Sequence, residues 1–169
     1  VAARMPALLR TAYLLTGDPH DAEDLVQTAL VKAVPAWKRI AGSPDAYLRR
    51  VMVNENISGW RRRRGREVLV GETPDRGQAD PDTASTLALQ RALAALAPRQ
   101  RAVIVLRYFE DLTERETAEV LGVAVGTVKS QARDALARLR LELPDLAFEE
   151  DAGPAAADRT RRKFPATAA

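Results

Sequence analysis

One stretch near the C-terminal end of the sequence combines hydroxyl and cationic side chains on one side of a predicted helix. These residues are Thr127, Lys129, Ser130, Arg133 and Arg138. Hydroxyl, ammonium and guanidinium groups donate hydrogen bonds to base edges and to phosphate oxygens, so this combination suits DNA binding. Apolar residues recur at helical spacing on the other side, from Val128 to Leu139, which predicts that this side packs on a core.

A preceding helix must hold that segment in place. Thr113 and Glu116 form the T-x-x-E pattern of a capping box, which predicts the start of a helix. Gly122 stands where this helix should end on a left-handed residue, and Ala118 is small where a second helix must pass close. Helical hairpins are common, but these spacings and the cationic outer side favour a helix-turn-helix whose second helix enters the major groove.

A second cationic group covers residues 61–66, with Trp60 directly before it. A run of arginines can simply be a solvated helix end, and this alternative stays open. An aromatic ring beside cations also suits unpaired bases, which stack on the ring while the cations hold phosphates. Asn54 precedes the run in the same predicted helix, where its amide could either bond a base edge or remain exposed.

The sequence shows no constellation typical of an enzyme. Asp21, Glu23 and Asp24 open a predicted helix, where acidic residues more often cap the helix than bind metal. The sole histidine, His20, is expected in a surface turn, and cysteine is absent. No phosphate-binding loop, dinucleotide motif, zinc-protease motif or nucleophile elbow is present. The sequence therefore predicts no metal, no cofactor and no catalytic residue, while a divalent-metal nucleic-acid enzyme built on these acids remains an alternative.

Composition predicts an all-α chain of two small domains. The 169 residues are 46% hydrophobic but only 5% aromatic, so the cores must be built from Ala, Leu and Val, which favours helices. Net charge is +5 over residues 1–65, −3 over 66–85, +3 over 86–141 and −2 over 142–169. This alternation predicts two polyanion-facing domains at 1–65 and 86–141, a flexible acidic linker at 66–85 and a disordered tail at 142–169.

Within these domains, apolar periodicity predicts further helices. They cover residues 4–16, about 20–37, 43–64 and a segment from about 86 that leads into a helix opened by Pro98. The apolar residues of the second helix recur at helical spacing up to Val34 and Trp37, and Pro35 is expected to kink or end it. The sequence contains no apolar run of about 20 residues and no signal peptide, so a cytoplasmic protein that does not enter a membrane is expected.

Taken together, the two halves resemble an extracytoplasmic-function (ECF) sigma factor, the small two-domain class of sigma-70 initiation factors. Three segments carry the resemblance: DAEDLVQTALVKA at 21–33, SPDAYLRRVMVNENISGWRRRRGRE at 43–67, and the stretch from LAPRQRAVIVL to DALARLR at 96–140. The VNxxxSxWRRRR run and GTVKSQ are most similar to the actinobacterial SigE-like subgroup. The resemblance implies a non-enzymatic factor that binds core RNA polymerase, recognises promoter DNA and melts it for transcription initiation.

Carried over by position, the resemblance implies roles for individual residues. Asp24 and Gln27 would contact the clamp helices of the polymerase beta-prime subunit, with the beta flap as a further polymerase contact. Asn54, with the loop 38–43, would recognise −10 bases on the opened strand. The melted DNA would be stabilised by Trp60, Arg61, Arg62, Arg63 and Arg64. The −35 element would be contacted in its groove by Thr127, Lys129, Ser130 and Arg133, and at its phosphates by Arg115.

The sequence departs from the family pattern at several positions. They are Thr28 in the clamp-binding segment, Glu55, Asn56 and Gly59 in the −10 segment, and Asp134 in the recognition helix. Asp134 could repel phosphate or pair with Arg138 four residues later. A stand-alone helix-turn-helix regulator is the alternative function, since it explains residues 86–141 equally well but not the first domain. The resemblance leaves an anti-sigma factor open as a further partner.

Overall fold

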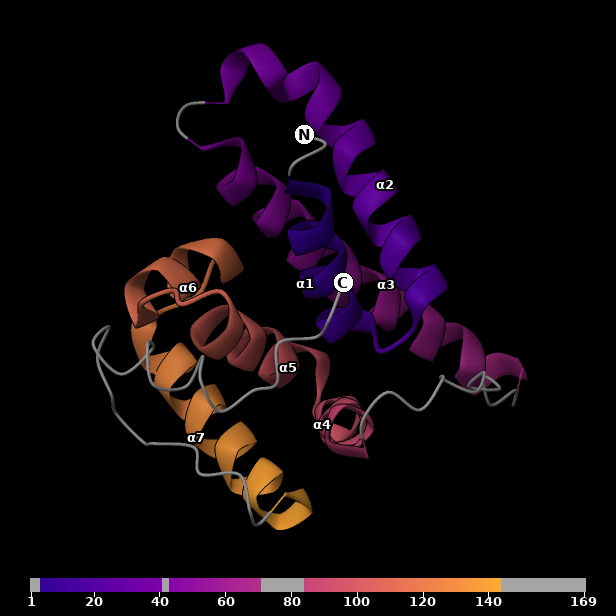
Figure 1. The fold of residues 1–169 in the computed structure, drawn as a ribbon, viewed down its shortest axis with the longest axis vertical. Coiled ribbons are helices and arrows are strands. Elements are labelled where there is room, and N and C mark those ends of the chain that lie inside the picture. Colours follow the sequence, from indigo (N-terminus) through magenta and orange to yellow (C-terminus); the bar gives the residue numbers. More distant parts are fainter. Residues whose placement is uncertain (1–3, 41–42, 71–83, 144–169) are drawn as a thin grey trace. The chain divides into compact units, whose positions relative to one another are not determined.

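The computed structural model describes residues 4–40, 43–70 and 84–143, although not the side chains of residues 39, 63–70, 84 and 85. All secondary structure in these ranges is helical (Figure 1), as the composition predicts, and none of these helices is long and apolar enough to span a membrane. The chain divides into two compact units, Val1–Ala79 and Asp80–Ala169. Most of the predicted linker, at 71–83, and the predicted tail from residue 144 lie outside the described residues.

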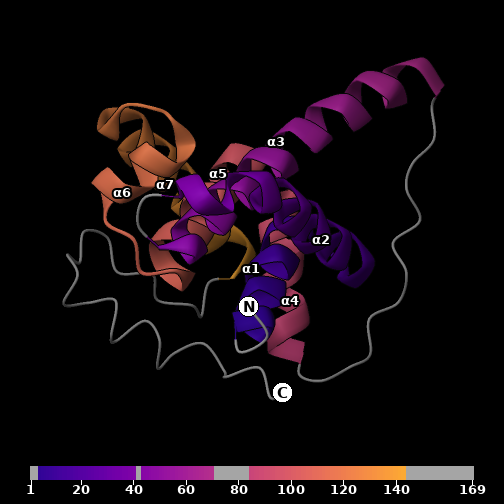
Figure 2. The ribbon, with the colours of Figure 1, turned by 90° about the horizontal axis from the view of Figure 1, so that it is seen from above.

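The first unit is built from three helices, α1 (Met5–Thr16), α2 (Pro19–Ala36) and α3 (Pro44–Val70), with a 3-10 turn, η2 (Trp37–Arg39), after α2. α1 and α3 both pack against α2 and also contact each other. Seen from above, the C-terminal end of α3 projects beyond α1 and α2 (Figure 2). The core of this unit consists largely of aliphatic side chains, among them Leu15, Val26, Met52 and Val53.

Local signals explain where α1 and α2 begin and end. α1 ends on Gly17, whose φ of 80° is left-handed and whose N–H donates to the Tyr13 carbonyl. The Asp18 carboxylate caps α2, because it accepts hydrogen bonds from the backbone N–H groups of His20 and Asp21, at 2.8 and 3.0 Å. Pro35 lies inside α2, one residue before its end, so the helix ends within a turn of Pro35, as predicted.

α3 runs further than the sequence predicts. The expected end near Arg64 is wrong, since the helix continues to Val70. Gly59 and Gly65 lie within it, each at a cost of about 1 kcal/mol relative to Ala, and neither breaks the helix. No proline or glycine stands between Gly65 and Gly71, so nothing in the local sequence stops the helix earlier.

The second unit contains α4 (Ala84–Ala95), α5 (Pro98–Ile104), a π-helical turn η3 (Val105–Phe109), α6 (Glu114–Leu121) and α7 (Val125–Glu142). α4, α5 and α6 each contact α7, so α7 is the helix that the other three share as a neighbour. The helix that Pro98 opens widens at its end, where the N–H of Glu110 donates to the carbonyl of Val105 and that of Leu112 to Leu106. The largest buried side chains here include Leu93, Ile104, Leu106 and Leu139.

Candidate nucleic-acid interface

The two-helix motif of the second unit begins with the predicted capping box. Thr113 Oγ1 accepts a hydrogen bond from the Glu116 N–H at 3.2 Å, and Glu116 Oε2 accepts one from the Thr113 N–H at 2.7 Å. α6 ends at Gly122, whose φ of 63° is left-handed and whose N–H donates to the Ala118 carbonyl. These contacts fix both ends of α6, and the predicted start and end of the helix are confirmed.

A small apolar cluster holds the turn between α6 and α7. Val103, Ala118 and Val128 form its buried part, and Leu121 and Val123 pack against it. Ala118 is only 5% exposed, so a larger side chain at this position would push the two helices apart. The predicted inner side of α7 is also confirmed, because its buried residues are Val128, Ala135, Leu136 and Leu139.

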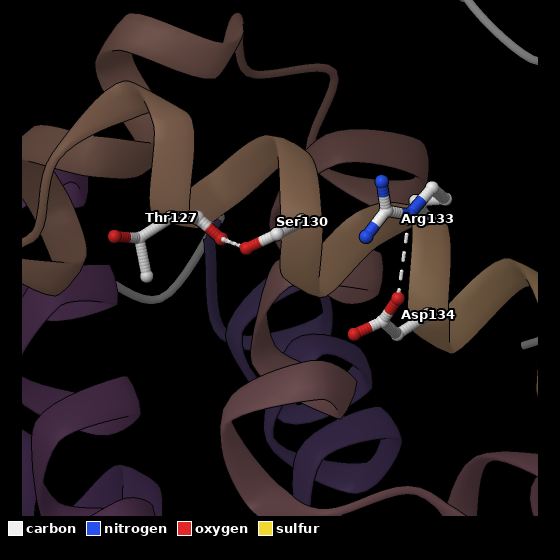
Figure 3. Close-up of polar contacts among 4 residues, drawn as sticks. All are labelled: Thr127, Ser130, Arg133 and Asp134. Atoms are coloured by element: carbon white, nitrogen blue, oxygen red, sulfur yellow. Dashed lines mark hydrogen bonds and ion pairs between the residues drawn. The ribbon is translucent and has the colours of Figure 1, made fainter.

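The outward side of α7 carries the side chains predicted to bind DNA. Thr127, Lys129 and Arg133 are exposed, and Ser130 is half-buried. The Ser130 hydroxyl donates to the Thr127 carbonyl oxygen, 3.0 Å away (Figure 3). A serine hydroxyl both donates and accepts, so it can bond a further group while this contact is kept or exchanged.

Two ion pairs involve this side of α7. Lys129 Nζ lies 3.5 Å from Glu114 Oε2, which connects α7 to the first turn of α6. Arg133 Nε lies 3.4 Å from Asp134 Oδ1 (Figure 3). Asp134 therefore pairs with its neighbour in sequence and not with Arg138, which the spacing had offered as a partner. Exposed pairs of this kind contribute at most about 1 kcal/mol to the stability of the fold.

Arg115 lies on the other helix of the motif. It is exposed in the first turn of α6. In a helix-turn-helix the first helix crosses the phosphate backbone, while the second enters the groove. The fold therefore gathers Thr127, Lys129, Ser130 and Arg133 on α7 and keeps Arg115 on the helix that would meet phosphates.

α3 of the first unit carries the residues predicted to bind unpaired DNA. Asn54, Arg61 and Arg62 are exposed and Trp60 is half-buried, while the side chains of Arg63 and Arg64 lie outside the described residues, as do residues 41–42 of the loop 38–43. Asn54 and Arg61 are seven residues apart, about two turns, so they lie on the same side of α3. Trp60 is turned by about 100° from Arg61, so it lies to one side of the surface that Asn54 and Arg61 share.

Two residues that depart from the family pattern have partners inside the first unit. Asn56 is 8% exposed, and its Nδ2 donates to the Leu15 carbonyl at 3.3 Å. Glu55 forms an ion pair with Lys32 of α2. Asn54 differs from both, because its side chain is exposed and available to a ligand. The amide that packs the unit and the amide that could bind DNA are therefore different residues.

α2 displays an apolar surface that the sequence did not single out. Asp24 and Gln27, predicted to contact polymerase, are both exposed. Val31 and Val34 follow on the same side in the next turns and are 70% and 73% exposed, and Trp37 after the helix is 47% exposed. Val34 and Trp37 share the apolar periodicity of α2, so the sequence holds no signal that separates them from its buried residues.

The acidic residues at the start of α2 do not form a metal site. Asp21, Glu23 and Asp24 are all exposed. Among the described residues, no group of three or more His, Cys, Asp or Glu side chains is arranged to hold a metal ion. Of the three, Asp21 lies in the first turn of α2, where a carboxylate interacts favourably with the helix dipole, and the cap itself is Asp18.

Comparison with known proteins identifies both units. The sigma-70 region 2 family matches residues 1–66, and the sigma-70 region 4 family matches residues 86–139. The RNA polymerase sigma-E factor of Streptomyces avermitilis is 48% identical over 147 residues, covering 85% of this chain and 82% of that protein. The ECF RNA polymerase sigma factor SigL of Mycobacterium tuberculosis is 38% identical over 152 residues, covering 82% of this chain and 84% of that protein.

Solved sigma-factor structures share the fold. RpoE of Bartonella quintana, solved in complex with the anti-sigma factor NepR, matches with a TM-score of 0.70 at 29% identity, over 86% of this chain and 95% of that chain. CnrH, solved in complex with the cytosolic domain of CnrY, matches with a TM-score of 0.62 at 25% identity, over 87% of this chain and 86% of that chain. The resemblance is thereby confirmed, and the chain belongs to the ECF RNA polymerase sigma factors of the sigma-70 family, which act in transcription initiation.

Proposed function

We propose that the two units of this sigma factor divide promoter recognition between them. The first unit binds core RNA polymerase through α2 and the opened −10 strand through α3, and the second reads the −35 duplex through α7. The observation that carries this proposal is the outward side of α7, where hydroxyl and cationic side chains are exposed while the apolar residues of the helix are buried. With DNA and polymerase as its partners, the protein acts in the cytoplasm.

The polymerase contact is assigned to the exposed side of α2. Asp24, Gln27, Val31 and Val34 are spaced by three, four and three residues, so they form one strip along the helix. Two valines that are 70% and 73% exposed leave apolar surface in water, and exposed apolar surface rimmed by polar groups is typical of an interaction site. We propose that this strip contacts the clamp helices of the beta-prime subunit and that the second unit contacts the beta flap.

The contact with melted DNA is assigned to α3. Asn54 offers an amide that can bond a base edge, and Arg61 lies two turns further on the same side, where it can hold a phosphate. Trp60 supplies a ring for stacking, and Arg62, Arg63 and Arg64 continue the cationic run. Unpairing costs a few kcal/mol per step, and capture of the freed bases offsets that cost without ATP.

The contact with duplex DNA is assigned to the N-terminal half of α7. Thr127 and Ser130 are three residues apart on one side of the helix, and Lys129 points about 100° away from Ser130, where it pairs with Glu114 of α6. The N-terminal residues of a recognition helix reach the base edges, so these three residues and Arg133 face the −35 groove. Arg115 of α6 binds a phosphate and so fixes the position of the second unit along the duplex.

Run-off transcription tests the proposal. Purified full-length protein is added to sigma-free core polymerase on genomic fragments, and the expected result is a set of defined start sites that core polymerase alone does not use. Failure to confer start-site selection on any template would overturn the proposal. The double substitution Lys129→Ala, Ser130→Ala should lower initiation at promoters with a −35 element at least tenfold, while the protein still co-elutes with core polymerase.

The relatives suggest a further partner. RpoE of Bartonella quintana was solved in complex with NepR, which is an anti-sigma factor, and CnrH was solved in complex with the cytosolic domain of CnrY. On this likeness we propose that an anti-sigma factor also holds this chain inactive. If it covers the exposed valines of α2, it must compete with core polymerase, which co-elution at increasing anti-sigma concentration would measure.

A further inference from the structure

Asp134 is an unusual residue for the side of a helix that meets DNA. It is the only acidic residue between Val125 and Leu141, in a helix whose outward side is otherwise hydroxyl, amide and cationic. Its side chain is 52% exposed. Ser130 precedes it by four residues and Thr127 by seven, so all three lie on one side of α7. A carboxylate there repels phosphates, which makes it costly for affinity alone.

The ion pair with Arg133 gives this carboxylate a role. Neighbouring residues on a helix point in different directions, so the contact forms because the long Arg133 side chain bends toward Asp134 (Figure 3). The bend draws the guanidinium toward the side that carries Thr127 and Ser130. Asp134 engages Nε, at 3.4 Å, which leaves the two terminal nitrogens of Arg133 to donate to a ligand.

We infer that Asp134 is a positioning residue that orients Arg133 to read a guanine at one end of the −35 element. Two parallel donors match the O6 and N7 acceptors of guanine in the major groove. Arg133 lies six residues from Thr127, about 9 Å along the helix, which corresponds to about three base pairs. The inference rests on the proposed function. It adds that Arg133 contacts a guanine and that Asp134 determines this base preference.

The chemistry predicts opposite effects of Asp134 on affinity and on specificity. Removing its charge lifts a repulsion from the phosphates, so binding to DNA without the element should tighten. It also frees Arg133 to adopt other orientations and to contact phosphates, so the preference for guanine should weaken. A residue that only supported the fold, or only solubilised the helix, would not produce this combination.

The test uses holoenzyme assembled from core polymerase and the full chain, with a promoter library in which only the −35 element is randomised. Sequencing of the transcripts gives the base preference at each position. We expect Asp134→Asn to lower the preference for guanine at one position about fivefold or more, with the other positions unchanged. Arg133→Ala should remove the preference at the same position, and the double variant should behave like Arg133→Ala. Glu142→Gln is the control, because it also removes a negative charge, two turns further along α7. It should change neither the guanine preference nor the binding to DNA without the element.

The outcomes separate the two proposals. If wild-type holoenzyme selects no member of the library, the proposed function fails and this inference falls with it. Wild-type selection can be intact while Asp134→Asn leaves the guanine preference unchanged, or lowers the base preference equally at all positions. In either case only the role of Asp134 is refuted. A change at a position that Arg133→Ala does not affect would also refute it, because Asp134 would then read a base itself.

Discussion

The side-chain amide of Asn56 donates a hydrogen bond to the backbone carbonyl of Leu15 at 3.3 Å, and so joins the middle of α3 to the last turn of α1. The last four carbonyl groups of a helix lack intrahelical donors, and this bond supplies one of them. Asn56 is 8% exposed and Leu15 is fully buried, so water does not replace the contact easily. Asn54, two residues earlier, is exposed and makes a useful comparison.

Replacing Asn56 should destabilise the first unit, and replacing Asn54 should not. Asn56→Ala leaves a buried acceptor without this donor, and we expect a loss of about 1–3 kcal/mol. That corresponds to a fall in melting temperature of several degrees for a unit of this size. Both tryptophans, Trp37 and Trp60, lie in the first unit, so their fluorescence follows its unfolding in the full chain.

Asn54→Ala is the matched control for this experiment. Its stability should stay within about 0.5 kcal/mol of wild type, because the side chain is exposed and Ala is a good helix former. Initiation at promoters with a −10 element should nevertheless fall. Equal melting temperatures for the Asn54 and Asn56 variants would contradict the assignment of one amide to packing and the other to DNA.

The parts of the fold that sequence predicts best are those specified by neighbouring residues. Thr113 and Glu116 meet within one turn, and Gly122 ends α6 by its own backbone freedom, so both are visible in the sequence. Asn56 and Leu15 are 41 residues apart, and helical periodicity shows only that an asparagine lies on the inner side of α3, not what it bonds. The sequence could therefore mark Asn56 as unusual without explaining it.

The same limit applies to the candidate site. The types of Thr127, Lys129 and Ser130 predict an outward side, because such groups stay hydrated unless a partner covers them. Val34 gives no such signal, since it continues the apolar spacing of the buried residues of α2, whereas Val31 lies on the opposite side of the helix from those residues. Only the packing of α1 and α3 determines which apolar residues are covered, and that packing depends on contacts far apart in sequence.

Two glycines of the helix-turn-helix should respond in opposite ways to substitution by alanine. Gly122 has a φ of 63°, and no atom lies within 4 Å of the position a Cβ would take, so the expected loss of about 1–2 kcal/mol in Gly122→Ala comes from backbone strain alone. Gly126 lies inside α7 with equally open space around it, and Gly126→Ala should stabilise the helix by up to about 1 kcal/mol. Hydrogen exchange of the α7 amides measures both changes in stability. If both variants lost stability, the different backbone conformations of Gly122 and Gly126 would not explain the result.

Polar substitution of the exposed valines should separate polymerase binding from stability. Val31 and Val34 are 70% and 73% exposed, so the double substitution Val31→Ser, Val34→Ser removes little buried surface and should barely change the melting temperature. If a partner covers these side chains, affinity for core polymerase should fall about tenfold or more.

Leu141→Ser is the control for the valine variant. Leu141 is 84% exposed near the end of α7, so the change removes a comparable apolar group from the surface of the other unit. It should leave co-elution with core polymerase unchanged. An unaltered affinity in the valine variant, measured by titration against core polymerase, would show that the partner binds elsewhere on the first unit.

Salt dependence should reveal whether the arginines after Trp60 contact phosphates. Arg61 and Arg62 are both exposed. Each phosphate contact adds about 0.7 to the slope of log K against log salt for single-stranded DNA and about 0.9 for duplex DNA, because a bound counterion is released. Holoenzyme carrying Arg61→Ala and Arg62→Ala should therefore bind a promoter with an opened −10 region with a slope smaller by about 1.4 to 1.8. Arg10→Ala removes an exposed arginine from α1 and should leave the slope as it is; an equal decrease in both variants would mean that overall charge, and not contact by α3, sets the dependence.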